Sequence, residues 1–411
     1  MFNISEDRIL LLGLGMQGEA ALYDLIDSDR SSEVIVGDKS PDSNRFVEKL
    51  DSNRVKFKQI DASDPEKVSD LMKRVDLVIE LLPPGFTFPI AKLAVENRVD
   101  MVSTMYLHDP EETDHEKKKA REKEIERLDR TAQENGITVL PEFGMDPGLD
   151  LVFAREAVRS FDELDGLYCY GAGLPVQEDA DNPLKYKFTW SVEGLLKTYK
   201  RPARIIKKGE VKDIPGDRLF NERNVHFLDI EELDGELECY PNGDTLEYGK
   251  RLDLNDDMEN FGRYTCRWKG HTDFWRTAVA CGLLDDEPIE VDGGEVIPIK
   301  FLAELLRSKD EFWLQEGERD LTMIRVEAKG ADAGEKKCKV YRLLDKRDLD
   351  TGFTAMQRTV GFTASIAVQM ILDGKLKQSG VLSPTDIPLS LISEELEDRG
   401  IKIDREETVI E

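Results

Sequence analysis

The sequence predicts an α/β protein whose amino-terminal part is a Rossmann-type, doubly wound parallel sheet. Three observations support this fold class: short apolar runs alternate with amphipathic stretches up to residue 145, a glycine-rich turn follows the first run, and an aspartate ends the second run. After residue 150, alternating strands separated by long charged loops indicate a second, α+β domain.

The apolar runs of the first part are expected to be parallel strands, because helical segments lie between them as crossovers. The runs are RILLLG, EVIVGD, VKFKQID, DLVIELLP, DMVSTMY and GITVLPEF. The charged segment HEKKKAREKEIERLDRTAQENG has opposite charges at i and i+4, which predicts a solvated outer helix. Near the end, TGFTAMQRTVGFTASIAVQMILDG is expected to be one apolar helix that returns to the first domain. We therefore expect a cofactor domain at 1–145, a substrate domain at 146–350, and a helical segment at 351–411.

The turn GLGMQG predicts the phosphate-binding loop of a dinucleotide site, because it follows an apolar strand and opens a helix. Gly13 permits the tight turn, Gly15 lets the backbone approach a pyrophosphate, and Gly18 lets helix and strand pack closely. Met16 and Gln17 complete the loop at the helix N-terminus, which offers unpaired N–H groups to phosphates.

Asp38 ends the second strand and is expected to bind the adenosine ribose of the cofactor. A carboxylate there accepts hydrogen bonds from the ribose hydroxyls and repels a 2′-phosphate, so we expect NAD. Lys39 and Ser40 follow directly and could weaken that exclusion, which keeps NADP open. Asp61 ends the third strand and either reaches the adenine or forms a turn or helix cap before ASDPEK.

Further candidates follow the later strands, because ligands of such sheets bind outside the carboxyl ends of the strands. Leu81, Leu82 and Pro83 are expected to cover the nicotinamide side, and Ser103 offers a hydroxyl near the ring. Asp146 would place a carboxylate at the domain boundary. Its alternative role is that of a turn residue, or the N-cap of the helix GLDLVFAREAV.

The segment NPLKYKFTWS alternates polar and aromatic residues in steps of two, which predicts an extended chain. One side would carry cations and hydroxyls, namely Lys185, Lys187, Thr189 and Ser191. The other side would carry Tyr186, Phe188 and Trp190. This pattern is typical of an antiparallel strand with one buried face, and also of a substrate wall facing an anion.

Composition excludes several classes of function. A formal charge of −28, from 57 basic and 85 acidic residues, argues against binding nucleic acid or an anionic membrane, but not against a small anionic substrate. The five cysteines lie far apart, so we expect neither a disulfide framework nor a structural zinc, and the four histidines suggest no metal site. The amino terminus reads as a first strand, and no apolar run approaches membrane length. We expect a cytoplasmic protein.

Longer stretches resemble the saccharopine dehydrogenase family, specifically its glutamate-forming branch. They are EFGMDPGLDLVFA, GLPVQEDADNPLKYKFTWSVEGLL, YPNGDT and TVGFTASIAVQMILDGKLKQSGVLSP, and the resemblance runs from about residue 7 to 401. It implies a Rossmann domain, an inserted substrate domain and a carboxy-terminal segment that rejoins the first domain. It also implies an NAD(P)-dependent oxidoreductase that interconverts an amino-acid imine and a secondary amine, here saccharopine of lysine metabolism. We expect a homodimer.

The resemblance assigns roles to individual residues. Ser103 matches a serine that touches substrate, and Asp146 matches an aspartate that faces the substrate amine. The segment 182–191 becomes a candidate wall for substrate carboxylates, with Lys185, Lys187, Thr189, Trp190 and Ser191 as contacts. His271 is a further candidate for substrate contact and proton transfer.

Two positions depart from the family pattern. YGAGLP has Gly171 where a cysteine is common, and YPNGDT has Gly243 where an arginine is common. Loss of that arginine removes a natural carboxylate clamp. Basic residues in GRYTCRWKGHTDFWR could compensate, namely Arg263, Arg267, Lys269, His271 and Arg276. Rival hypotheses are a related amine dehydrogenase (the lysine 6-dehydrogenase or carboxynorspermidine dehydrogenase type) and a non-catalytic NAD-binding sensor.

Overall fold

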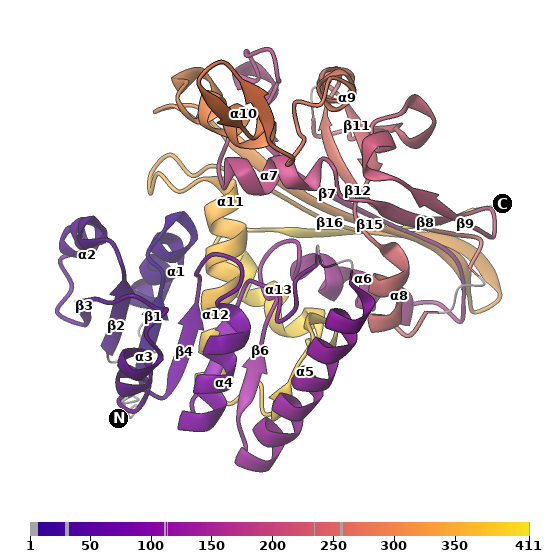
Figure 1. Cartoon of the computed structure of the whole chain (residues 1–411). Helices are drawn as coiled ribbons and strands as arrows, with labels where there is room; N and C mark the ends of the chain where they lie inside the picture. The colour runs from indigo at the N-terminus through magenta and orange to yellow at the C-terminus, as the bar shows by residue number, and fades with distance from the viewer. Residues whose placement is uncertain are drawn as a thin grey trace. The chain divides into compact units, whose positions relative to one another are not determined.

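The computed structural model describes residues 7–28, 33–110, 112, 114–233, 235–254 and 258–410. The chain divides into two compact units, and each unit combines two separate stretches. Unit 1 comprises Met1–Val152 and Gln357–Gly400, and unit 2 comprises Phe153–Met356 and Ile401–Glu411. Figure 1 labels most of their helices and strands.

Unit 1 is built on a seven-stranded sheet in the order β17-β6-β5-β4-β1-β2-β3, and every pair in it is parallel. The strands are β1 (Arg8–Leu12), β2 (Glu33–Asp38), β3 (Val55–Gln59), β4 (Leu77–Glu80), β5 (Asp100–Ser103), β6 (Thr138–Leu140) and β17 (Gly380–Val381). Six of these are the strands that the apolar runs predict, so the Rossmann-type prediction is confirmed. The seventh, β17, comes from the carboxy-terminal stretch and pairs with β6.

Helices of unit 1 connect and cover these strands. They are α1 (Met16–Asp27), α2 (Asn44–Lys49), α3 (Pro65–Met72), α4 (Thr87–Asn97), α5 (His115–Asn135), α12 (Thr363–Leu372) and α13 (Leu389–Asp398). The charged helix α5 begins after Asp114, whose side chain accepts from the first-turn N–H groups, and ends at Gly136 with φ 70°.

The carboxy-terminal segment returns to the first sheet over residues 357–400, as the sequence predicts, but the expectation for 401–411 is wrong, because β18 joins the sheet of unit 2. The expected single helix is α11 (Ala355–Gln357), a π-helical turn (Arg358–Phe362) and α12, which packs against α1, β4 and β5 (Figure 1). Gly361 permits this close approach, because a Cβ there would lie 2.6 Å from the carbonyl oxygen of Gln17. The buried Asp24 of α1 also accepts hydrogen bonds from Ser365 and Gln369 of α12.

Unit 2 contains a nine-stranded mixed sheet with the main order β10-β11-β12-β7-β15-β16-β18, and β8 pairs with β12 and β9. Only β7 and β12 pair in parallel. The strands are β7 (Glu163–Pro175), β8 (Ala203–Lys207), β9 (Glu210–Ile214), β10 (His226–Asp229), β11 (Glu236–Pro241), β12 (Asn260–Trp268), β15 (Asp320–Asp332), β16 (Glu335–Lys346) and β18 (Ile403–Val409). A hairpin of β13 (Ile289–Val291) and β14 (Gly294–Val296) stands apart. This α+β unit agrees with the predicted fold class.

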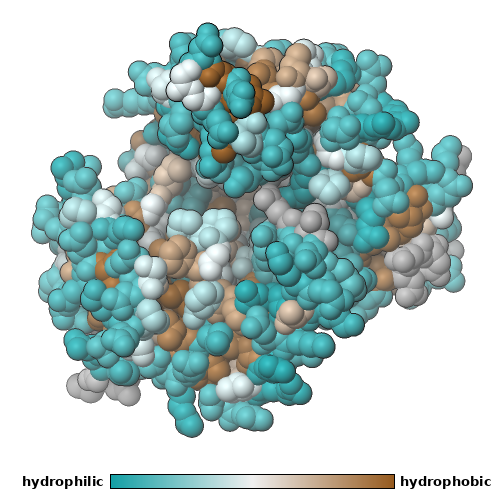
Figure 2. All heavy atoms as spheres, in the orientation of Figure 1, coloured by the Kyte–Doolittle hydropathy of each residue, from teal (hydrophilic) through white to brown (hydrophobic). Residues whose placement is uncertain are grey.

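The helices of unit 2 are α6 (Leu149–Arg159, which begins in unit 1), α7 (Val192–Thr198), α8 (Thr245–Arg251), α9 (His271–Ala280) and α10 (Pro298–Arg307). An aromatic and aliphatic core gathers residues of α7, α9 and α10 with Tyr186, Phe188 and Tyr240. None of the helices among the described residues is long and apolar enough to cross a membrane. The face in Figure 2 is largely hydrophilic, in line with the excess of charged residues.

Two expectations for unit 2 are wrong. Cys239 and Cys266 lie opposite each other in β11 and β12 and form a disulfide, although their separation of 27 residues gives no pairing signal. The segment NPLKYKFTWS is not a regular strand: it is irregular, with a single isolated bridge at Phe188. Asn182 causes this, because its side chain accepts from the N–H of Leu184 and donates to the carbonyl of Tyr186, which curls the chain into a turn.

Candidate active site

The carboxyl ends of β1 and β4 form the point of unit 1 where the strand order reverses, which is where such sheets bind dinucleotides. Gly13 has φ 94°, and a Cβ there would lie 2.6 Å from the carbonyl oxygen of Leu81. A Cβ at Gly18 would lie 2.1 Å from the carbonyl oxygen of Gly13. Gly15, the N-cap of α1, has no atom within 4 Å of its Cβ position, so a phosphate group can approach the helix N-terminus there.

The remaining residues of this loop lie beside the same helix end. Met16 is exposed, and its carbonyl oxygen accepts a hydrogen bond from the Gln357 side chain at 2.9 Å. Gln17 is half-buried. Leu81 and Leu82 are half-buried and Pro83 is exposed directly after β4, so their side chains line the edge next to Gly13.

Asp38 has a backbone role in the structure. Its carboxylate accepts from the N–H of Leu14 and from the N–H of Ser40, both at 2.7 Å, so it ties the glycine loop to the end of β2. Lys39 is exposed, and its ammonium group lies 3.0 Å from the Asp61 carboxylate. Hydrogen bonds from Ser63, and then the contact with Lys39, hold the pKa of Asp61 below its ordinary value. The turn interpretation of Asp61 is therefore the one that its contacts support.

Glu80 is a residue at this edge that the sequence analysis missed. It ends β4 opposite Leu12 of β1 and Ser103 of β5, and it is 0% exposed. Its carboxylate accepts from the Ser103 hydroxyl at 2.7 Å and from the N–H of Leu82 at 2.8 Å. Burial raises the pKa of Glu80, and these two hydrogen bonds, together with the nearby Thr87 hydroxyl, partly oppose the rise. A charged residue inside the apolar run DLVIELLP was the signal that could have found it.

Ser103 and Asp146 lie on segments that pair with each other. The buried Ser103 hydroxyl also accepts from the N–H of Met105, and the Ser103 carbonyl accepts from the N–H of Phe143 at 2.8 Å. Asp146 follows in an exposed turn that the Gly144 N–H closes on the carbonyl of Pro147. The N–H of Gly148 in that turn donates to a different carboxylate, that of Asp150.

In unit 2, the two lysines of the segment 182–191 have different surroundings. Lys187 is buried, and its ammonium group binds the carboxylates of Glu318 and Asp181, the latter at 3.2 Å. Burial alone would lower the pKa of Lys187, but these carboxylates raise it. Lys185 is exposed and donates to the carbonyl of Lys269 at 2.9 Å. The two side chains thus share no common exposed face.

The other members of the segment are divided in the same way. Thr189 is buried, whereas Ser191 is exposed and caps α7 by accepting from the N–H of Gly194. The Trp190 indole is half-buried and donates to the Tyr186 hydroxyl at 3.1 Å. Within the segment, Lys185, Trp190 and Ser191 retain accessible surface for a ligand.

His271 occupies the aromatic core at the start of α9. It is 1% exposed, its Nε2 lies 2.8 Å from the Tyr199 hydroxyl, and its Nδ1 lies 2.8 Å from the Leu184 carbonyl. Burial, and then the positive charge of Arg267, lower the pKa of His271 to about 3. A neutral histidine with both nitrogens engaged is typical of a structural residue, and it is not placed to exchange protons with a substrate.

Arg267 of β12 is a buried cation that lies among aromatic side chains. It is 5% exposed, its guanidinium lies 4.9 Å from the centre of the Tyr186 ring, and one terminal N–H donates to the carbonyl of Cys266. Its Nε has no hydrogen-bond partner, and it forms no ion pair with a carboxylate of the described chain. Burial favours loss of the charge, but the phenols of Tyr240, Tyr199 and Tyr186 outweigh it and raise the pKa of Arg267.

Acidic groups near Arg267 are engaged elsewhere. Glu238 faces it across the β11–β12 pair, but its carboxylate accepts from the N–H groups of Gly270 and Thr272 and from the Thr272 hydroxyl. Other cations of the same stretch have carboxylate partners: Lys269 binds Glu236, and Arg276 binds Asp273 and Glu222. Arg263 stacks on the Tyr248 ring.

Gly243, which stands where an arginine is common, has an arginine beside it. It adopts φ 66°, and a Cβ there would lie 3.8 Å from the Cδ of Arg201. Arg201 follows α7 and is half-buried. A guanidinium side chain therefore lies near this position, although it comes from another part of the chain.

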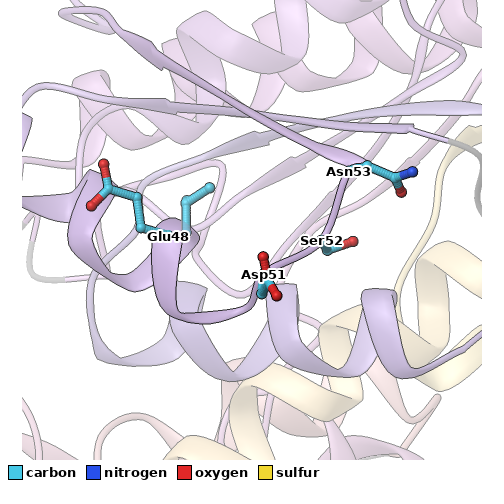
Figure 3. A pocket seen from close by; sticks show the side chains of 5 residues that line it. Glu48, Asp51, Ser52 and Asn53 are labelled. Carbon is cyan, nitrogen blue, oxygen red and sulfur yellow. The ribbon is translucent and has the colours of Figure 1, made fainter.

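Figure 3 shows a surface hollow elsewhere in unit 1. It is lined by Val47, Glu48, Asp51, Ser52 and Asn53, at the end of α2 and before β3. This hollow lies at the amino end of β3, whereas dinucleotides bind at the carboxyl ends. We therefore do not assign it to the active site. Among the described residues, no cluster of histidine, cysteine and acidic side chains is placed to hold a metal ion.

Comparison with known families shows the family to which the chain belongs. The family model described as saccharopine dehydrogenase NADP binding domain matches residues 9–140, and the one described as saccharopine dehydrogenase C-terminal domain matches residues 144–401. The chain belongs to the saccharopine dehydrogenase family. It is an oxidoreductase with a nicotinamide dinucleotide-binding domain, as the sequence resemblance implied.

Individual relatives agree with this membership. Saccharopine dehydrogenase (NADP(+), L-glutamate-forming) of Schizosaccharomyces pombe is 24% identical over 97% of this chain and 98% of that protein. Mitochondrial alpha-aminoadipic semialdehyde synthase of Mus musculus is 26% identical over 98% of this chain. This chain spans about half (48%) of the length of that protein. The solved structure of apo saccharopine dehydrogenase (L-Glu forming) from Saccharomyces cerevisiae superposes with a TM-score of 0.82 over 98% of this chain and all of that one, at 22% identity. This last likeness shows the shared fold.

Proposed function

We propose that this saccharopine dehydrogenase family member interconverts saccharopine with an amino-acid imine, in lysine metabolism. The observation that supports this substrate is Arg267, a guanidinium buried in unit 2 without a carboxylate partner. A buried charge is costly unless an opposite charge compensates it, so a substrate carboxylate is the natural counterion. Arg201 beside Gly243 offers a second guanidinium, and Lys185, Trp190 and Ser191 are the accessible contacts of the segment 182–191.

Two residues of unit 1 are proposed to manage the reacting amine. Asp146, exposed in its turn, would stabilise the iminium and exchange protons with the amine nitrogen. The Ser103 hydroxyl already donates to Glu80, so it would help chiefly by fixing the backbone beside Phe143. A bound nicotinamide supplies the hydride, and the chain needs only to hold and orient the C=N carbon.

We further propose that the cofactor is NADP(H), instead of the NAD that Asp38 led us to expect. Both carboxylate oxygens of Asp38 already accept from backbone N–H groups, which leaves this residue less suited to a ribose. The exposed ammonium group of Lys39 is the adjacent cation for a 2′-phosphate. The names of the fungal relative and of the matching amino-terminal family both include NADP.

Steady-state assays with saccharopine, free lysine and a carboxylated polyamine test the substrate. We expect saccharopine to have the highest kcat/KM, because lysine leaves most of the cationic groups without a partner. Gly243 is the observation that favours the amine dehydrogenase alternative, and a higher kcat/KM for lysine or the polyamine would support it. Cofactor binding without turnover of any of these substrates would instead support a sensor. A cytoplasmic homodimer stays a proposal from the family resemblance, to be tested by analytical ultracentrifugation and cell fractionation.

A further inference from the structure

Glu80 is a buried carboxylate at the point where the dinucleotide binds, and the proposed chemistry does not use it. Its β-pairing partner Leu12 directly precedes Gly13, and its hydrogen-bond partner Leu82 belongs to the segment that borders Gly13. No cation of the described residues forms an ion pair with Glu80. Its carboxylate accepts from the Ser103 hydroxyl and the Leu82 N–H, and the Thr87 hydroxyl is also nearby.

A carboxylate at this position distinguishes the two redox states of a nicotinamide. The ring carries a positive charge when it is oxidised and is neutral when it is reduced. In a site shielded from water, a nearby negative charge stabilises the positive ring more strongly than it would in solvent. The neutral ring gains no such attraction, so the effect is a difference between the two affinities and not a general gain.

We propose that the buried carboxylate of Glu80, at the switch point between β1 and β4, makes unit 1 bind the oxidised cofactor in preference to the reduced one. It acts through its charge and touches no reacting atom. The positive ring itself favours the charged form of Glu80, because a nearby positive charge opposes the rise that burial causes in the pKa of this carboxyl group. Hydrogen bonds from Ser103 and Leu82 fix the carboxylate at the end of β4. Such a preference shifts the equilibrium between the enzyme-bound states towards amine formation and cofactor oxidation, and leaves the equilibrium in solution unchanged. The inference rests on the cofactor part of the proposed function and not on the substrate.

Equilibrium binding of NADP⁺ and NADPH to the full chain, without substrate, tests the proposal. NADPH is followed by its fluorescence and NADP⁺ by calorimetry or by competition. Glu80→Gln keeps the size of the side chain and one acceptor but removes the charge. We expect it to raise the ratio Kd(NADP⁺)/Kd(NADPH) about tenfold, mainly by weakening the binding of NADP⁺.

Glu80→Asp is the matched control, because it alters the same side chain and its hydrogen bonds and keeps the charge. We expect it to leave the ratio within about twofold of the wild-type value. If Glu80→Gln shifts both Kd values equally, or neither, Glu80 only supports the segment after β4 and the proposal is overturned. If Glu80→Gln does not fold, Glu80→Asp alone decides: a wild-type ratio supports the proposal and a tenfold rise contradicts it. A wrong substrate would leave all these values unchanged, so the two failures can be told apart.

Discussion

Each unit buries a charged side chain that forms no ion pair with a described residue, and the two side chains compared below have opposite signs. Glu80 of unit 1 is 0% exposed and Arg267 of unit 2 is 5% exposed, and neither forms an ion pair with a described residue. Some other buried ions have opposite charges beside them, such as Lys187 with Glu318 and Asp181. Buried Glu238 and Asp320 have no ion pair either, and accept hydrogen bonds from N–H or hydroxyl groups. Burial of an ion without an opposite charge is costly, and Glu80 and Arg267 lie at the proposed cofactor and substrate sites, where a ligand of opposite charge would compensate them.

The two units also hold their buried polar groups in different ways. In unit 1, backbone N–H groups and hydroxyls fix the carboxylates of Asp38 and Glu80 at strand ends. In unit 2, aromatic side chains surround Arg267 and His271 within a packed core. Substitutions in unit 1 should therefore change binding and turnover, whereas those in unit 2 should also change the stability of the core.

The largest expected effect is on substrate binding, when the charge of Arg267 is removed. Arg267→Met should raise KM for saccharopine by about 100-fold, because a buried charge-assisted contact is lost. The free energy of unfolding should stay the same or rise, since an uncompensated buried charge disappears. Arg276→Met, which removes a half-buried and paired arginine of α9, should leave KM unchanged. A large loss of stability with an unchanged KM would show that Arg267 only supports the aromatic core.

The next effect is on stability and comes from His271. Its native pKa of about 3 lies below the unfolded value of 6.5, so the unfolded chain takes up a proton that the native core rejects. The stabilising contribution is therefore present above pH 6.5 and is lost as pH falls from 6.5 towards 3. Relative to His271→Gln, wild type should lose about 2–3 kcal/mol between about pH 7.5 and pH 4.5. Urea unfolding followed by tryptophan fluorescence measures this, because all four tryptophans lie in unit 2. If the difference in unfolding free energy between wild type and His271→Gln does not vary with pH, the buried neutral state assigned to His271 is wrong.

Asp146 in unit 1 should affect turnover and not stability. Asp146→Asn is expected to lower kcat by about 100-fold, which is typical of a positioned proton-transfer group. The Kd for the cofactor and the midpoint of unfolding should stay near their wild-type values, because the side chain is exposed. If the variant keeps its turnover and loses stability instead, the turn or cap interpretation of Asp146 applies.

Unit 1 was predictable from the sequence to a greater extent than unit 2. Parallel strands covered on both faces read as continuous apolar runs, and the glycine spacing locates the turn after β1. Glu80 was missed for the same reason, because its run was read only as an apolar strand. The sequence alone does not show that the Glu80 side chain is buried or which groups it contacts. In unit 2, the side-chain hydrogen bonds of Asn182 and the positive φ of Lys185 overrode the alternation of NPLKYKFTWS. The pairing of Cys239 with Cys266 depends on strand register, which no local pattern specifies.

The smallest expected effect concerns the choice of cofactor at the end of β2. Lys39→Ala should raise the Kd for NADPH about tenfold and leave the Kd for NADH unchanged, because only NADPH carries the 2′-phosphate that this ammonium group would bind. Asp61→Asn should lower the Kd for NADPH, since Lys39 would no longer be held 3.0 Å from a carboxylate. Arg45→Ala removes another exposed cation of unit 1, one that pairs with Asp42, and should change neither Kd. Fluorescence titration with NADPH and NADH measures all three variants. If wild type binds NADH tenfold more tightly than NADPH and Lys39→Ala leaves both values alone, the charge of Asp38 controls the cofactor after all.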